Sequence, residues 1–226
     1  MSERFDIYRN IHMGLRACMM EVLLAVGRMD PQDVAELGTV LGQVRFLLRF
    51  CQLHLKKEEK FVHPAMEARA PGSTTHIASD HGDHLRALEE LEAAVVAVEQ
   101  AADGARQKPA LALYKQLALF VGENFVHMHI EETDHNEVLW RTHCDQEIIA
   151  IEHAIIASLE PEDKPLTLRW MLPALSPQVR AMMVGMLRAN LPPEAMAGIM
   201  AMLKAHLSDA NWRKLTEALD RMPAAA

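Results

Sequence analysis

The chain has 226 residues, which is enough for one well-buried domain or two small ones. Of these residues 50% are hydrophobic and 24% are charged, which is typical of a globular protein. This balance argues against a disordered or fibrous protein. Asp and Glu outnumber Lys and Arg by 31 to 23, and the net charge of −8 argues against binding to nucleic acid or to an anionic membrane. No apolar run is long enough to span a membrane, and we expect no signal peptide at the N-terminus. Three widely separated cysteines indicate a reducing compartment, so we expect a cytoplasmic protein.

Residues that favour helices dominate and β-branched runs are nearly absent, so we predict an all-α fold. We expect Asp30 and Pro31 to begin the second of four long helices, with the proline at its first position. The four predicted helices cover about residues 2–26, 31–69, 73–102 and 109–140. Long helices joined by short links are typical of an up-down-up-down four-helix bundle, which we assign to residues 1–142.

The remainder of the chain, residues 143–226, has a different pattern. Its predicted helices are short, and several begin with a capping residue followed by proline. Methionines give these helices an apolar stripe. We interpret this part as a helical C-terminal extension that packs on the bundle or on a partner.

On each long helix, His or Glu side chains interrupt the apolar residues that repeat every three or four positions. Burying such groups without partners costs several kcal/mol each, so they must compensate one another, and a metal is the simplest common partner. In an antiparallel bundle, residues early in the odd helices and late in the even helices lie at the same end. The interrupting residues have this placement: His12; His54 and Glu58; His81 and His84; His127 and Glu131.

The chemistry of these residues also favours a metal site. His54 and Glu58 are four residues apart, as are His127 and Glu131, so each pair lies on one helix face. Five His and two Glu are enough to hold two metal ions about 3.5–4 Å apart. Imidazole and oxygen donors suit iron or manganese better than the thiolate-rich sets that favour structural zinc.

At these positions the sequence resembles the hemerythrin-like (HHE cation-binding) family. The similarity covers about residues 5–140 and is carried by four stretches of sequence: IHMGLR from Ile11, HLKKEEKFVHP from His54, DHGDH from Asp80 and HMHIEE from His127. The resemblance implies a non-haem di-iron centre, with an oxo or hydroxo bridge, inside a four-helix bundle. It implies that the iron ligands are His12, His54, Glu58, His81 and/or His84, His127 and Glu131. A five-residue spacing, as in classical hemerythrin, would instead select Glu132 as the last ligand.

The function implied is binding or sensing of O2 or NO, or the handling of iron or peroxide under oxidative stress. Two alternatives remain: a di-iron enzyme that reduces peroxide or O2 or repairs iron–sulfur clusters, and a metal-free helical interaction module. A redox partner or a second copy of the chain would be the protein partner. We expect His63 and His135 to lie beyond the ligands, either beside them or in solvent. Tyr8 is expected to donate a hydrogen bond at the site or to pack in the core.

Overall fold

The structure is a computed structural model that describes residues 4–222, and within them helices are the only regular secondary structure. The chain divides into two compact units. Residues up to Arg9 and Cys18–Ser158 form the first unit, and Asn10–Ala17 with the residues from Leu159 onward form the second. Among the helices of this described part, none combines the length and hydrophobicity of a membrane-spanning segment.

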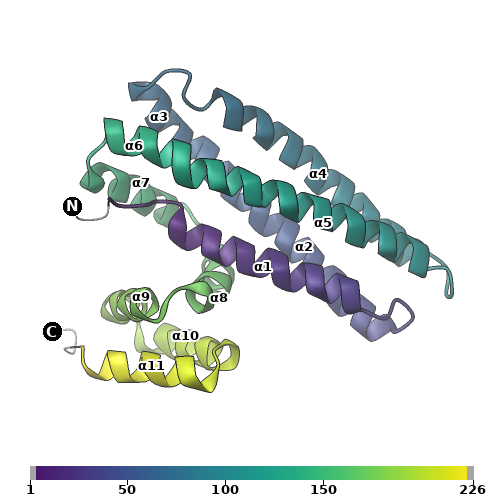
Figure 1. Cartoon of the computed structure of the whole chain (residues 1–226). Coiled ribbons are helices and arrows are strands. Elements are labelled where there is room, and N and C mark those ends of the chain that lie inside the picture. The colour runs from purple at the N-terminus through teal and green to yellow at the C-terminus, as the bar shows by residue number, and fades with distance from the viewer. Residues whose placement is uncertain (1–3, 223–226) are drawn as a thin grey trace. The chain divides into compact units, whose positions relative to one another are not determined.

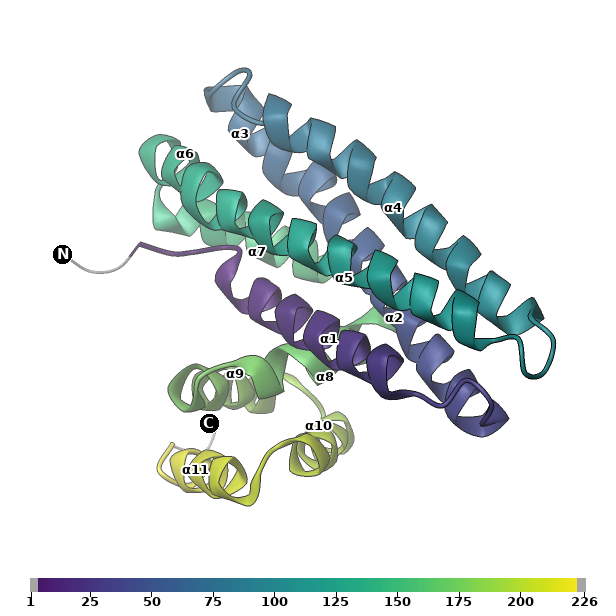
Figure 2. The ribbon, with the colours of Figure 1, turned by 45° about the vertical axis from the view of Figure 1, so that its right-hand side comes forward.

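Long helices dominate the first unit, and α2, α4 and α5 run side by side in two views of the molecule (Figures 1 and 2). Two short π-helical segments, η1 and η2, continue α2 and α5 without a break. The bounds are α1 (Arg9–Arg28), α2 (Val34–Lys57), η1 (Glu58–Val62), α3 (His63–Arg69), α4 (Thr75–Gln100), α5 (Gln107–Ile130), η2 (Glu131–His135), α6 (Asn136–Thr142) and α7 (Asp145–Ala157).

The first helix begins later than predicted. Ser2, its expected start, lies outside the described residues, and residues 4–8 are not helical. The reason is local, because the carboxylate of Asp6 accepts hydrogen bonds from the backbone N–H groups of Tyr8 and Arg9, at 3.0 and 3.1 Å. An aspartate that binds the first free N–H groups of a helix fixes where the helix begins.

The predicted start of the second helix at Pro31 is also wrong. Asp33 is the capping residue, since its side chain accepts hydrogen bonds from the backbone N–H groups of Ala35 and Glu36, at 2.9 and 3.0 Å. Helix α2 therefore begins at Val34. Asp30 and Pro31 form the preceding turn instead, in which the N–H of Asp33 donates to the carbonyl of Asp30.

The second and fourth predicted helices extend about as far as expected, but neither is a continuous α-helix. The first π segment begins at Glu58 and the second at Glu131. A π turn has an i→i+5 hydrogen bond and so contains one more residue than an α turn. The extra residue changes which later side chains share a face with these two glutamates.

Helix α7 packs with the first unit, which extends to Ser158. Ile148 of α7 is fully buried in a cluster with Val62, Met66 and Leu139. Arg69 and Glu147 also form an ion pair at 2.6 Å between α3 and α7. The division of the chain into functional domains remains a prediction.

The second unit contains four short helices, as expected for the C-terminal part: α8 (Asp163–Ala174), α9 (Pro177–Asn190), α10 (Pro193–His206) and α11 (Asp209–Asp220). Its core is centred on Leu172, Val184, Leu203 and Leu215, each at most 1% exposed. The stretch of α1 that belongs to this unit packs closely on α8. A Cβ atom at Gly14 would lie 2.9 Å from the Cα atom of Met171, so only glycine allows this approach.

Candidate metal centre

Four stretches of helix contribute imidazoles and carboxylates to one buried cluster, and two of them are an α-helix continued by a π segment. Glu58 and Glu131, the first residues of the two π segments, are 3% and 0% exposed. His12, His81 and His127 are buried, and the side chain of His54 is 10% exposed. The cluster thus consists of His12 from α1, His54 from α2, Glu58 from η1, His81 from α4, His127 from α5 and Glu131 from η2.

These six residues form two overlapping groups of four that share Glu58 and Glu131. One group adds His81 and His127 and lies wholly within the first unit, and the other adds His12 and His54. In each group the potential ligand atoms, one from each residue, all lie within 4.8 Å of one another. Donor atoms that surround one ion at about 2.1 Å are separated by up to about 4.2 Å, so each group is close to the size of a single coordination shell.

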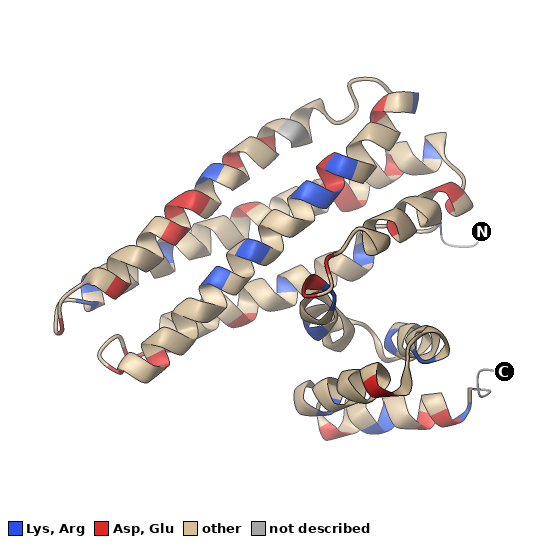
Figure 3. Ribbon diagram, turned by 180° about the vertical axis from the view of Figure 1, so that it is seen from behind, with Lys and Arg blue, Asp and Glu red and all other residues tan. Residues whose placement is uncertain are grey.

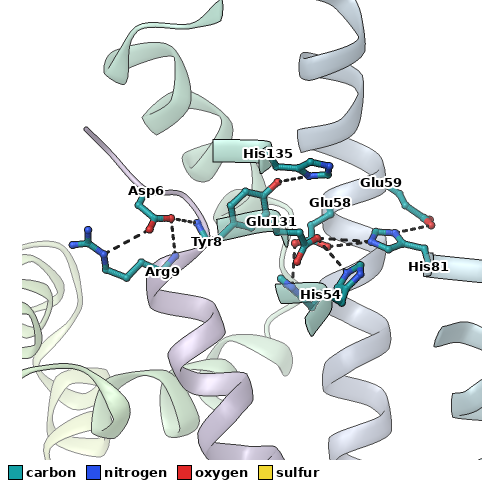
Figure 4. Close-up of polar contacts among 10 residues, drawn as sticks. Asp6, Tyr8, Arg9, His54, Glu58, Glu59, His81, Glu131 and His135 are labelled. Carbon is teal, nitrogen blue, oxygen red and sulfur yellow. Dashed lines mark hydrogen bonds and ion pairs between the residues drawn. The ribbon is translucent and has the colours of Figure 1, made fainter. Parts of the chain in front are cut away.

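Ring nitrogens of His54 and His81 point at the buried carboxylates (Figure 4). His54 Nε2 lies 3.1 Å from Glu58 Oε1, and His127 Nε2 lies 3.3 Å from Glu131 Oε1. The two residues of each pair are four positions apart in the sequence, so helical geometry alone brings them together. His81 Nε2 lies 3.6 Å from Glu58 Oε2 and 3.9 Å from Glu131 Oε1, and so joins the two pairs.

Carboxylates also lie near the opposite nitrogens of two of these rings. Glu59 Oε1 lies 3.3 Å from His81 Nδ1, and Asp80 Oδ2 lies 3.9 Å from His127 Nδ1. A carboxylate beside one imidazole nitrogen fixes the orientation of the ring and makes the other nitrogen a better metal ligand. Glu59 is therefore a positioning residue for His81 that the sequence analysis did not identify.

The electrostatics of the site favour a bound cation. The pKa of Glu58 is raised well above its usual value, chiefly by burial and next by the negative charge of Glu131. A cation next to both carboxylates would reverse this effect, because it stabilises their charged forms. The pKa of His63 and that of His84 are each lowered to about 4, chiefly by burial and then by neighbouring imidazoles. These two rings are therefore neutral at pH 7.

The donor atoms present fit a metal. Within the described chain, the Nε2 atoms of His81 and His127 are buried and accept or donate no hydrogen bond. Such buried nitrogens are costly unless something binds them. Their distances of 3.3–3.9 Å to carboxylate oxygens are longer than hydrogen bonds and match neighbouring donors around a shared ion.

Two predicted alternatives occupy different places in the structure. His84 is buried beside the cluster, with its ring centroid 4.6 Å from that of His127, but it belongs to neither group of four. It follows His81 by three residues and therefore lies about one turn further along α4. Glu132, the alternative to Glu131, is partly exposed and also belongs to neither group.

His63 and His135 are buried beside the cluster, at 7% and 3% exposure, and neither is solvated. The ring of His63 stacks on that of His81 with centroids 4.9 Å apart, and the Tyr8 hydroxyl lies 3.2 Å from His135 Nδ1 (Figure 4). Tyr8 is itself buried, and burial followed by the charge of Glu131 raises its pKa. Each π turn adds one residue to its helix, so a regular repeat of 3.6 residues per turn does not predict whether His63 and His135 are buried or exposed to solvent.

Comparisons with known proteins agree with this geometry. A family model described as the hemerythrin HHE cation binding domain matches residues 4–138, which is more than half of the chain and includes all six clustered residues. No curated protein and no solved structure gives a significant match.

Proposed function

Because the chain belongs to the hemerythrin HHE cation-binding domain family, we propose that it is a non-haem di-iron protein that binds or senses O2 or NO, or handles iron or peroxide under oxidative stress. The observation that supports this most directly is that two groups of potential ligands share Glu58 and Glu131. Shared carboxylates suit a pair of neighbouring ions better than one ion. The proposal includes an up-down-up-down arrangement of the four helices that supply these ligands.

In this proposal His12 and His54 would hold one ion, His81 and His127 would hold the other, and Glu58 and Glu131 would contact both. Nitrogen and oxygen donors favour iron, with manganese as the alternative. A bound pair of reduced iron ions supplies electrons and open coordination positions to a small ligand such as O2 or NO.

The chain's own residues would shield and tune this site. Apolar side chains precede or follow the ligands along three helices, and Leu47, Leu88 and Phe120 are at most 6% exposed. They would exclude water and so slow the loss of electrons to solvent. The Tyr8 hydroxyl at His135 would hold a proton beside the carboxylates. A metal-free interaction module is disfavoured, because it would leave buried imidazole nitrogens without partners.

We also propose a cytoplasmic location. The cysteines Cys51 and Cys144 are free thiols, and Cys144 is exposed. Free, exposed thiols are typical of a reducing compartment.

Elemental analysis and visible spectroscopy of the purified protein test the proposal. We expect two iron ions per chain, and an absorption change when the anaerobically reduced protein meets O2 or NO. Sustained consumption of O2 or peroxide with an electron donor would identify an enzyme rather than a carrier or sensor. Protein that binds no iron, or iron that does not respond to these ligands, would contradict the proposal.

A matched pair of neighbouring substitutions tests the ligand assignment. Glu131→Gln should reduce the iron content, because Glu131 belongs to both groups. Glu132→Gln removes the same charge one residue away and should leave two iron ions per chain, because Glu132 belongs to neither group. The reverse result would assign the last carboxylate ligand to Glu132.

A further inference from the structure

Large apolar side chains are exposed on one pair of helices of the first unit. Two belong to α1 and four to α5, with exposures between 37% and 63%: Met20, Leu24, Leu111, Tyr114, Leu119 and Val126. Elsewhere in the described part of this unit, only Val34 and Ile156 are large, apolar and exposed. Single exposed apolar residues are ordinary, but a concentration on two adjacent helices indicates an interface.

Helix α5 is unusual in its lack of charge. Among its 24 residues, the only Lys, Arg, Asp or Glu residues are Lys108, Lys115 and Glu123. Helices α2 and α4 instead carry charged residues along their length, as Figure 3 shows from behind. A helix that is apolar on most of its circumference is normally covered on both sides, whereas residues 4–222 leave Leu111, Leu119 and Val126 of α5 exposed.

The exposed residues of α1 and those of α5 meet where Gly27 lies beside Tyr114, and we call the surface that they share the α1–α5 face. Met20, Leu24 and Gly27 are four and three residues apart and therefore lie on the same side of α1. Gly27 lies against α5, since a Cβ atom there would be 2.9 Å from Cε2 of Tyr114. The two helices lie next to each other in both Figure 1 and Figure 2.

We propose that a second copy of this chain covers this face, with the two α5 helices packed antiparallel about a two-fold axis at Leu119. Leu119 lies at the middle of α5, so the two helices would overlap along their full length. In such a pair, a residue at a given number of positions before Leu119 faces the residue the same number after it. Lys115 would face Glu123 of the other copy, and Ala112 would face Val126.

This charge pattern supports a second copy over an unrelated partner. Lys115 and Glu123 have opposite signs, are both exposed, and each lie four residues from Leu119. A two-fold contact therefore forms two complementary pairs from these two residues. Gly122 lies between them on the exposed face with nothing within 4 Å of a Cβ atom, so an opposing helix can approach closely.

The size of the face is sufficient for a dimer. Helix α5 is about 36 Å long and the stretch of α1 in this unit, residues 18–28, is about 16 Å long, so at a diameter of about 10 Å the two present roughly 500 Å². Two copies would then bury roughly 1,000 Å² in total, which is the lower limit for a specific interface.

Sedimentation equilibrium of the full chain tests the proposal. We expect a species of twice the chain mass of 25.4 kDa. Leu119→Lys and Gly122→Lys should each give a monomer, and a Cβ atom at residue 122 has no atom of its own copy within 4 Å. Lys115→Glu and Glu123→Lys should each raise the dimer Kd by about tenfold or more, because each places like charges opposite one another twice. The double variant should restore the wild-type Kd.

The charge reversal Glu89→Lys, on the exposed side of α4, is the matched control and should leave the dimer unchanged. Circular dichroism and iron content should be the same in every variant, so that a loss of fold is not mistaken for a loss of assembly. A wild-type chain that is monomeric at every concentration tested overturns the proposal. A dimer that survives Leu119→Lys, or one that the double charge swap fails to restore, overturns it as well.

Discussion

His81 and His84 lie one turn apart on α4 and both are buried, yet only His81 belongs to a group of potential ligands. His81→Ala should therefore release metal, because it removes one of four donors from a group that has no spare imidazole. His84→Ala should leave two ions per chain. It should lower the free energy of unfolding by about 1–2 kcal/mol, since it removes the contacts of this ring with His127 and Phe120.

Metal content by elemental analysis and thermal unfolding distinguish the two variants. Equal losses of metal would make His84 a ligand as well. Retention of two ions in His81→Ala would mean that the described cluster is not the metal centre.

The residues that sequence analysis could identify are those that break an apolar repeat. His54 and Glu58 do so on one helix, and His127 and Glu131 on another, because helical periodicity relates residues four apart. Glu59 breaks no such repeat, since it lies among charged residues at the surface. Its role at His81 depends on how α4 packs against η1, which no local pattern in the sequence records.

Among the elements, the π segments were the least predictable feature of the fold. The helices that contain them were predicted, because their apolar residues repeat at helical spacing on both sides of the π turn. The extra residue of a π turn leaves no such mark in a short sequence window. It nevertheless decides that His63, five residues after Glu58, is buried against His81. The start of the second helix is also hard to predict, because Asp30 and Asp33 are both residues that cap helices and only the structure shows that Asp33 is the cap.

A second prediction concerns the close packing of α1 on α8. Gly14→Ala should lower the free energy of unfolding by about 1–3 kcal/mol, because the new Cβ atom would lie 2.9 Å from backbone Cα of Met171 and would force the helices apart. Gly42→Ala on α2 is the matched control. It has nothing within 4 Å of a Cβ atom and should raise the free energy of unfolding by up to about 1 kcal/mol, because alanine favours a helix.

Urea unfolding measures the free energy of unfolding of both variants, which should fall for Gly14→Ala and rise for Gly42→Ala. Stabilisation by Gly14→Ala would show that α8 does not pack against this stretch of α1 in solution. Destabilisation by Gly42→Ala would show that a partner or another part of the chain covers this face of α2.

For the whole molecule, the distribution of the ligands along the chain allows the two units to be separated experimentally. All six clustered residues precede residue 132, whereas the first unit continues to Ser158. A chain ended after Ser158 should keep two iron ions, with a lower melting temperature because Asn10–Ala17 lose the unit they pack with. A chain ended after Thr142 also loses α7, so it exposes the apolar cluster around Ile148.

The shorter chain should therefore be less stable than the longer one by about 2–4 kcal/mol, the usual effect of removing a fully buried side chain such as that of Ile148 with its neighbours. Its iron should also be lost at a lower temperature, because α7 holds α3 through Arg69 and Glu147, and α3 continues directly from the π segment that positions Glu58. Thermal unfolding with metal analysis at each temperature measures both effects. If ending the chain after Ser158 already removes the iron, the C-terminal helices are needed to keep α1 and His12 in place. If ending it after Thr142 changes nothing, α7 contributes nothing to the metal centre.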